Sequence, residues 1–316
     1  MYYIGIDVGG TNLVAGLVNE AGRILDKVNH PVDKAMSAEE LCLDLARMSK
    51  KLCEMGSVDF SQIEAVGVGL PGLVDNGAGV VVQTVNMAFD NTPLREIFQR
   101  EWDVPVFLGN DANCAAAGEY WAGAAKGCDP AVVVTLGTGI GGGMVANGKV
   151  FTGFANSGME VGHMIVHPNG VLCSCGNRGC WEQYGSATAL IRLTQLEMER
   201  DRDSAMWELC EGDRFKAQGR TPFAAARQGD PAAKRVLAAY LQGLSVGIIN
   251  LVNILQPEII CLGGGVSGAE DDLLLEPLRE LVIQGTFDKN NPTRLERASL
   301  GNDAGVVGAA LLCNML

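Results

Sequence analysis

Three cysteines within one short stretch form the densest set of metal-binding side chains in the sequence. They stand as Cys173-x-Cys175-x₄-Cys180, and His163 and His167 precede them. Thiolates and imidazoles are ligands that tetrahedral zinc prefers, and a zinc ion with four protein ligands keeps no position open for water. We therefore predict a structural zinc site, whose fourth ligand the spacing leaves open between the two histidines.

Two glycine-rich turns are candidates for binding phosphate. The first is Asp7-Val8-Gly9-Gly10-Thr11 and the second is Thr135-Leu136-Gly137-Thr138-Gly139, each between short apolar runs. Glycine lets backbone amides approach an anion, and threonine hydroxyls can donate to phosphate oxygens. Asp7 would repel a phosphate unless Mg²⁺ or its water lay between them. The two turns together predict a clamp for phosphates and Mg²⁺.

A dinucleotide site is the competing interpretation, because G-x-G-x-x-G occurs twice, at Gly67-Gly69-Gly72 and at Gly137-Gly139-Gly142. That fingerprint requires a helix directly after the glycines, because the helix N-terminus holds the pyrophosphate. Here Gly142 is followed by a short apolar run and the hairpin signal Asn147-Gly148, and Gly72 by the turn-rich Asp75-Asn76-Gly77. We therefore predict no dinucleotide site.

A carboxylate at the end of a predicted strand is the candidate catalytic base. The apolar run 104–108 leads into Asn110-Asp111, and an alanine-rich helical stretch follows. Transfer of a phosphoryl group to a hydroxyl needs a group that accepts the hydroxyl proton. Asp111 suits that role, but its position would equally suit a helix N-cap. The spacing alone leaves both interpretations open.

The composition excludes several classes of protein. The 316 residues carry 24 basic and 37 acidic side chains, a net charge of −13, whereas phosphate neutralisation by a nucleic-acid binder needs a basic surface. The most apolar window, 131–146, is interrupted by glycines and predicts no membrane span. The N-terminus has no signal-peptide pattern, and the cysteines outside the cluster are scattered as buried free thiols are. We expect a cytoplasmic protein that binds neither nucleic acid nor membrane.

The elements that must position these residues alternate between strands and helices. Residues 2–25 predict a strand, a glycine turn and a second strand, and residues 131–151 repeat this order. A capping box at Ser37 and an Asp230-Pro231 pair each open a predicted helix. Strands mixed with helices twice over predict an α/β architecture in two lobes, with a ligand in the cleft between them. The charged stretch 195–218 is expected to be a solvated helical excursion without chemistry.

The two glycine turns resemble the phosphate motifs of the actin-like sugar kinases. Glu160-Val161-Gly162-His163, followed by the cysteine cluster, is similar to the ROK family (repressors, open reading frames and kinases), and within it to the glucokinases. The resemblance covers almost the whole chain. It implies a two-lobed actin-like ATPase fold, a duplicated ribonuclease-H-like fold with the ligand cleft between the lobes. The small lobe would comprise 1–112 plus 301–316, and the larger lobe, 113–300, would carry the zinc loop.

The resemblance also implies an activity and its residues. The activity is ATP-dependent phosphorylation of the 6-hydroxyl of glucose, a step of glycolysis, by a homodimer or homotetramer with Asp111 as base and Mg²⁺ bound with ATP. His163 would be the fourth zinc ligand and would donate to the sugar with its other ring nitrogen. The sugar-binding residues would be Gly72, Asn110, Asp111, Glu160, His163 and Glu182. The ATP-binding and phosphate-binding residues would be Asp7, Gly9, Gly10, Thr11, Asn12, Thr135, Gly137, Thr138, Gly139, Gly141, Gly263, Gly264 and Gly265.

Two rival functions remain open. The first is a kinase for another hexose or N-acetylhexosamine (mannose, fructose, allose, N-acetylglucosamine or N-acetylmannosamine), because the same acidic and amide groups serve several sugars. The second is a non-catalytic, sugar-responsive ROK repressor. Such repressors carry an N-terminal helix-turn-helix domain, for which the position of Asp7 leaves no room in this sequence. A filament-forming actin relative is disfavoured by the zinc loop and the Glu-x-Gly-His motif.

Overall fold

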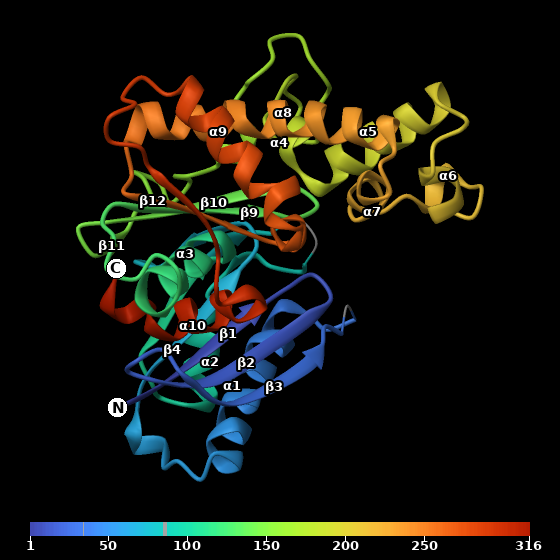
Figure 1. Cartoon of the computed structure of the whole chain (residues 1–316). Coiled ribbons are helices and arrows are strands. Elements are labelled where there is room, and N and C mark those ends of the chain that lie inside the picture. The colour runs from blue at the N-terminus through green and yellow to red at the C-terminus, as the bar shows by residue number, and fades with distance from the viewer. Residues whose placement is uncertain (34, 85–86) are drawn as a thin grey trace. The chain divides into compact units, whose positions relative to one another are not determined.

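The computed structural model describes residues 1–33, 35–84 and 87–316 (Figure 1). The chain divides into two compact units. Unit 1 comprises Met1–Val133, Gly143–Met159 and Ala298–Leu316, and unit 2 comprises Val134–Gly142 and Glu160–Arg297. Strands and helices are mixed in both units, so the predicted α/β class is confirmed.

Unit 1 is built on a five-stranded sheet in the order β3-β2-β1-β4-β8. Strands β1 to β3 are antiparallel, and β1 pairs with β2 across the first glycine turn, as predicted. Strands β1, β4 and β8 are parallel, so their carboxyl ends share one edge, where Asp7 pairs with Gly69 and Gly69 pairs with Gly109. The strands are β1 Tyr2–Val8, β2 Asn12–Asn19, β3 Ile24–Pro31, β4 Ile63–Leu70 and β8 Val106–Asn110.

Helices cover both faces of this sheet. The apolar face of α1 (Ala38–Met55), which opens with the predicted capping box at Ser37, packs with α2 (Leu94–Glu101) in the main core of the unit. The C-terminal helix α10 (Ala304–Leu311) packs on the other face together with α3 (Asp111–Ala122). Glycines let α10 lie close to both β4 and α3. A Cβ atom at Gly67 would overlap the Ala309 carbonyl, and one at Gly308 would overlap the Cys114 carbonyl.

These glycine contacts explain a difference from the predicted lobes. We expected the border after residue 112, whereas the contacts group residues 113–133 and 143–159 with unit 1. Helix α3 lies against α10, and α10 lies against β1 and β4, so α3 cannot separate from the first sheet without losing this packing. A small three-stranded sheet follows Gly72 in the same unit: β5 Leu73–Asp75, β6 Val80–Gln83 and β7 Asp90–Thr92.

The second five-stranded sheet has the order β11-β10-β9-β12-β13. Read along the chain, this is the order of the first sheet: third, second, first, fourth and fifth strand. The predicted hairpin at Asn147-Gly148 joins β10 to β11, and β12 pairs in parallel with β13. The repeated order supports the predicted duplication. The strands are β9 Ala131–Leu136, β10 Ile140–Ala146, β11 Lys149–Val150, β12 Ile259–Gly263 and β13 Arg294–Arg297.

The core helix of unit 2 is α8 (Pro231–Leu255), which Asp230 caps by accepting a hydrogen bond from the Ala233 amide at 2.8 Å. Among the described residues it is the one helix long and apolar enough to cross a membrane, and half of its apolar window is buried inside the structure. The fully buried Trp181 packs against it, and a Cβ atom at Gly247 would overlap the Trp181 ring. The remaining helices of the unit are α4 Glu182–Gly185, α5 Ala187–Arg200, α6 Met206–Leu209, α7 Thr221–Arg227 and α9 Leu275–Gly285.

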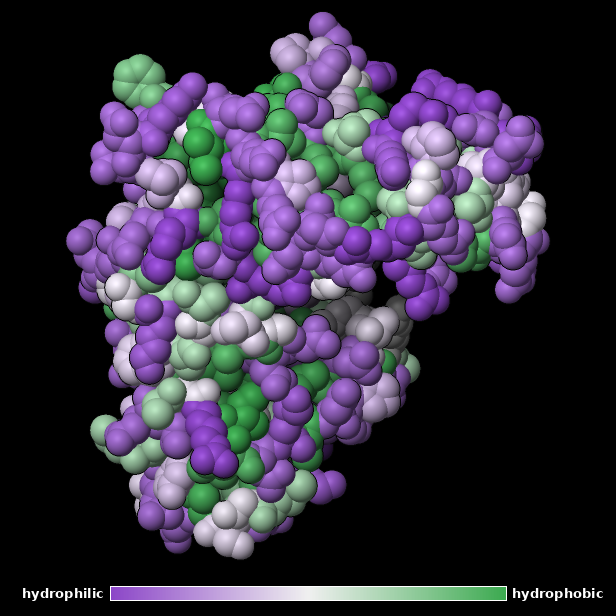
Figure 2. Space-filling view, in the orientation of Figure 1, coloured by the Kyte–Doolittle hydropathy of each residue, from purple (hydrophilic) through white to green (hydrophobic). Residues whose placement is uncertain are grey.

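Seven 3₁₀ turns complete the described secondary structure. They are η1 Phe60–Gln62, η2 Val161–His163, η3 Arg214–Lys216, η4 Gly265–Gly268, η5 Asp271–Leu273, η6 Gly301–Asp303 and η7 Leu312–Asn314. Hydrophilic side chains cover most of the face shown in Figure 2, with apolar side chains exposed between them.

Candidate active site

Two aspartates lie close together at the carboxyl edge of the first sheet. Asp7 is the next-to-last residue of β1, and Asp111 is the first residue of α3, directly after β8. The pKa of Asp7 is raised to about 6, mainly because the carboxyl group is buried and also because the charge of Asp111 disfavours ionisation. Like charges that perturb each other inside a site are typical of functional centres.

Asn110, and not Asp111, caps the helix that follows. Its side-chain oxygen accepts hydrogen bonds from the amides of Ala112 at 2.9 Å and Asn113 at 3.3 Å. Its side-chain amide donates to the Gly72 carbonyl at 3.1 Å, which joins two of the three sugar-binding positions predicted in unit 1. The exposed Asp111 carboxylate accepts from the Ala112 amide at 2.8 Å. The question of the N-cap is therefore answered in favour of Asn110.

The first glycine turn leaves open space beside Asp7. The Gly9 amide donates to the Asn12 carbonyl at 2.9 Å and closes the turn. A Cβ atom at Gly10 would meet nothing within 4 Å, and the side chain of Thr11 is exposed. Mg²⁺ prefers carboxylate oxygens and keeps several waters. A partly buried carboxylate close to the charge of a second one, next to an open turn, fits such a cation.

Two residues that the sequence analysis missed border Asp7. A Cβ atom at Gly305, in α10, would lie 2.8 Å from Oδ2 of Asp7. Cys114, in α3, is fully buried, and the pKa of its thiol is raised well above its usual value by burial and by the charges of Asp7 and Asp111. The thiol is therefore neutral. In the sequence, Gly305 is marked only as a glycine at the start of the predicted C-terminal helix, and nothing there indicates that it borders Asp7.

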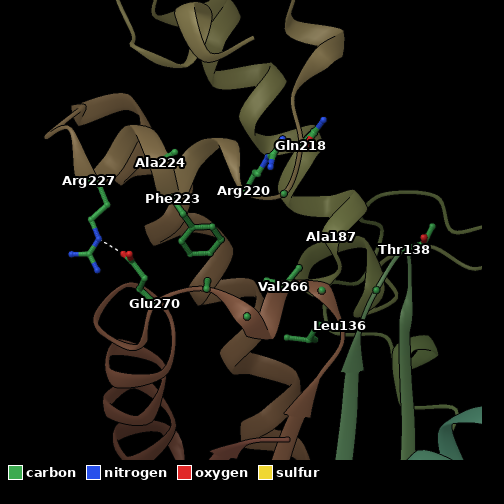
Figure 3. Close-up of a pocket in the computed structure, with 15 residues that line it drawn as sticks. Leu136, Thr138, Ala187, Gln218, Arg220, Phe223, Ala224, Arg227, Val266 and Glu270 are labelled. Atoms are coloured by element: carbon green, nitrogen blue, oxygen red, sulfur yellow. Dashed lines mark hydrogen bonds and ion pairs between the residues drawn. The ribbon is translucent and has the colours of Figure 1, made fainter. Parts of the chain in front are cut away.

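The second glycine turn borders a pocket of about 650 Å³ in unit 2 (Figure 3). Of the predicted phosphate-binding residues, Gly137, Thr138 and Gly265 line this pocket. Thr135, Gly139, Gly141, Gly263 and Gly264 lie in the same strands and turns but do not line it. A pocket of this size, largely apolar with a few polar groups, is typical of a small-molecule site.

The opposite side of this pocket was not predicted. Helix α7 and the residues before it line the pocket, and Figure 3 shows the ring of Phe223 pointing into it. The stretch 195–218, which is expected to carry no chemistry, reaches the pocket at its end, where Gln218 lines it. No motif marked these residues, since only the packing of α7 on α8 brings them here. The unpredicted lining residues with polar or aromatic side chains are Gln218, Arg220, Phe223, Arg227 and Glu270.

The four predicted metal ligands lie together in unit 2. The ligand atoms of His163, Cys173, Cys175 and Cys180 all lie within 4.8 Å of one another. Nδ1 of His163 is 3.7 Å from Sγ of Cys173, and the sulfurs of Cys175 and Cys180 are 3.6 Å apart. A tetrahedron with Zn–S bonds of about 2.3 Å has edges of about 3.8 Å, so this set fits zinc. His167 is not part of the set and stacks on Tyr184, with ring centroids 5.7 Å apart.

The predicted sugar-binding residues of unit 2 adjoin this cluster. Oε1 of Glu182 accepts a hydrogen bond from the Cys173 thiol at 3.0 Å. The Glu160 carbonyl accepts from the His163 amide at 3.0 Å, within the turn η2. Gly139 borders the same carboxylate, because a Cβ atom there would lie 2.6 Å from Oε2 of Glu182. The metal cluster therefore includes His163 and lies against the side chain of Glu182, two groups that could bind sugar hydroxyls, and Glu160 adjoins it through the backbone.

The chain matches known proteins over nearly its full length. The model of the ROK family matches residues 3–315. The glucokinase of Thermotoga maritima is 37% identical over 315 residues, which cover 97% of this chain and 95% of that protein. The crystal structure of a ROK family glucokinase from Streptomyces griseus in complex with glucose and AMPPNP is 35% identical, with a TM-score of 0.81 and 99% of both chains covered. The ROK hexokinase of Thermus thermophilus is 34% identical, with a TM-score of 0.82, and the match covers 99% of this chain and 97% of that one.

Proposed function

The chain belongs to the ROK family and has its two-lobed actin-like ATPase fold, and from this membership we propose that it is an ATP-dependent hexose kinase that phosphorylates the 6-hydroxyl of glucose. The observation that carries the proposal is the pair of aspartates at the edge of the first sheet, where the charge of Asp111 helps to raise the pKa of Asp7 to about 6. The names of the full-length relatives, and a solved relative with glucose and an ATP analogue, support the same activity.

In this proposal Asp111 accepts the proton of the 6-hydroxyl as that oxygen attacks the γ-phosphorus of ATP, while the bond from this phosphorus to the β–γ bridging oxygen breaks and ADP leaves. Its side chain is exposed, and the helix is already capped by Asn110, so the carboxylate is placed to act on a substrate. Asn110 retains one N–H beyond its bond to Gly72, and we assign that N–H to a sugar hydroxyl. Glu160, His163 and Glu182 complete the sugar contacts. The two carboxylates accept hydrogen bonds from adjacent hydroxyls, and the His163 ring donates one.

Asp7 is the residue that would hold Mg²⁺ or a water of its shell. Mg²⁺ bound with ATP would supply neutralisation of the phosphate charge. The amides of the first glycine turn and the hydroxyls of Thr11 and Thr138 would contact the phosphates. The nucleobase of ATP would lie in the pocket beside Phe223. The apolar part of that pocket's lining suits a flat nucleobase more than a further charged group.

The cysteine cluster would hold zinc in a structural role. His163, Cys173, Cys175 and Cys180 provide four protein ligands, which leaves no position for a reacting water. The metal would fix the loop that ends at Glu182 and orient the imidazole of His163 toward the sugar. Thiolate sites of this kind persist in a reducing compartment, so we also propose that the enzyme is cytoplasmic. From the family resemblance we expect a homodimer or homotetramer.

The test is ADP release with Mg²⁺-ATP against glucose, mannose, fructose, allose, N-acetylglucosamine and N-acetylmannosamine. We expect the highest kcat/KM with glucose. A higher value with another sugar would keep the kinase and its residues but replace the proposed substrate. No turnover with any sugar, in protein shown by metal analysis to contain zinc, would overturn the proposal and favour a sugar-binding protein without catalysis.

A further inference from the structure

The pocket of unit 2 has two walls that come from separate segments of the chain. One wall is α7, with Phe223, Ala224 and Arg227, and the other is the stretch that includes Val266 and Glu270. In Figure 3 the two walls face each other, and an ion pair between Arg227 and Glu270 joins them. Where this ion pair lies, side chains and not continuous backbone close the pocket.

The second wall has little regular structure of its own. Between β12 and α9 the chain forms only the two short turns η4 and η5. This stretch contains Gly264, Gly265 and Gly268, and a Cβ atom at either of the last two would meet nothing within 4 Å. The buried Val266 and Ser267 anchor the start of the stretch, whereas its later part is mostly exposed and has few packing contacts of its own. The position of this later part must therefore depend on contacts from other segments.

Two arginines provide those contacts. Arg297, at the end of β13, bonds to the Ala269 carbonyl and donates to Oδ1 of Asp271 at 2.8 Å. Arg227 forms an ion pair with Glu270 and donates to Oδ2 of Asp272 at 2.7 Å and to its Oδ1.

Only one of these arginines belongs to the pocket. Arg227 lines it and Arg297 does not. The hydrogen bond from Arg227 also holds the pKa of Asp272 below its usual value, which agrees with the bidentate geometry. The link between the two walls is therefore Arg227.

We propose that Arg227 is a positioning residue for the phosphoryl donor: its ion pairs with Glu270 and Asp272 set the separation of the two pocket walls and thereby the affinity for the nucleobase. This inference rests on the proposed kinase function. A flat base that stacks on Phe223 gains contact on both of its faces only if the opposite wall lies within van der Waals distance. Arg227 affects the binding of the nucleobase by holding that wall in place, and it needs no contact with the phosphates.

The first experiment uses Arg227→Gln in the full chain. Exposed ion pairs are weak singly, so we expect a rise of roughly 3- to 10-fold in KM for Mg²⁺-ATP and in Kd for ADP, measured by calorimetry. The kcat at saturating ATP and the KM for glucose should stay unchanged, because neither Arg227 nor its two acidic partners are among the proposed catalytic or sugar-binding residues. The matched control is Arg235→Gln, which breaks a similar exposed arginine network with Glu197 and Asp201 elsewhere in unit 2.

The second experiment separates positioning from general loss of stability. Arg227→Glu alone should weaken ADP binding further, and so should Glu270→Arg together with Asp272→Arg. Combining all three substitutions restores opposite charges across the pocket and should recover most of the affinity. The melting temperature of each variant is measured in parallel, and the recovery of affinity is expected even where the melting temperature does not recover.

Four outcomes would overturn the inference: an unchanged KM for ATP in Arg227→Gln, an equal loss in Arg235→Gln, a fall in kcat with KM unchanged, or no recovery in the charge-swapped variant. A wild-type protein that binds no nucleotide would overturn both this inference and the proposed donor. A wild-type protein that phosphorylates glucose normally, with Arg227→Gln indistinguishable from it, would overturn this inference alone.

Discussion

Gly305 of the C-terminal helix lies against the carboxylate of Asp7, so close that a Cβ atom would come within 2.8 Å of Oδ2. The last helix of the chain thus forms part of the surroundings of a residue near its start. Because α10 also packs on β1 and β4 through close backbone contacts, it cannot easily move away to make room.

We expect Gly305→Ala to displace the Asp7 carboxylate and to lower kcat/KM for Mg²⁺-ATP by about tenfold or more, since displacements of about 1 Å can cost up to about a hundredfold in rate. The measurement is steady-state kinetics with varied Mg²⁺-ATP. The control is the same change in an Asp7→Asn background. If Gly305→Ala lowers kcat/KM as much there as in the wild type, it does not act through Asp7.

Asp111→Asn is expected to lower kcat by about 10² to 10⁴, the usual contribution of a general base, while the Kd for glucose changes less than about threefold. Single-turnover kinetics and calorimetry with glucose separate the two quantities. Asp103→Asn, another exposed aspartate of unit 1, is the matched control and should behave like the wild type. Near-normal turnover in Asp111→Asn would disprove the assignment of the base.

The pKa of Asp7 makes stability depend on pH. Its pKa is raised from 3.8 to about 6 in the folded chain, so the folded state holds its proton to higher pH than the unfolded state. The stabilisation from this proton is complete below pH 4 and is lost as pH rises through 6. The difference corresponds to about 3 kcal/mol.

Asp7→Asn removes this dependence. We expect the free energy of unfolding of the variant, relative to the wild type, to increase by up to about 3 kcal/mol between pH 4 and pH 8, because each pKa unit corresponds to 1.36 kcal/mol. Urea unfolding of both proteins at several pH values gives this difference, and the other titrating groups cancel in it. A difference that stays constant or falls with pH would contradict the raised pKa of Asp7.

Metal analysis should find about one zinc per chain in the wild type. Cys175→Ser should lose the metal, lower the melting temperature and weaken glucose binding, because the cluster includes His163 and adjoins Glu182. Cys313→Ser changes a half-buried cysteine outside the cluster and should keep the zinc. A wild-type protein free of zinc after expression in zinc-supplemented medium would rule out the structural metal.

Features encoded locally could be predicted from the sequence. The glycine turns, the capping box at Ser37, the hairpin at Asn147-Gly148 and the cysteine cluster each depend on residues within a few positions of one another. The α/β class and the repeat of the strand-turn-strand unit followed from their arrangement, whereas the order of the strands in each sheet came from the structure. Identifying the residue that caps α3 needed the structure, because Asn110 and Asp111 are both good capping residues and only geometry separates them.

Contacts between distant segments could not be predicted in the same way. Gly305 and Cys114 border Asp7 only because α10 and α3 pack against the first sheet. Phe223 and Arg227 reach the pocket only because α7 packs on α8. A glycine, a buried cysteine and a single phenylalanine occur throughout soluble proteins, so residue type carries no signal until the packing is known.

The packing of Trp181 on α8 bears on how this protein can evolve. Glu182 directly follows Trp181, whose position depends on the absence of a side chain at Gly247 and on a hydrogen bond to the Gly243 carbonyl at 3.2 Å. Substitutions on α8 would therefore shift Glu182, which we propose contacts the sugar, without touching the sugar themselves. Relatives that prefer different sugars are expected to differ on this helix face as well as among the residues that contact the substrate, and an engineered change of sugar preference can begin there.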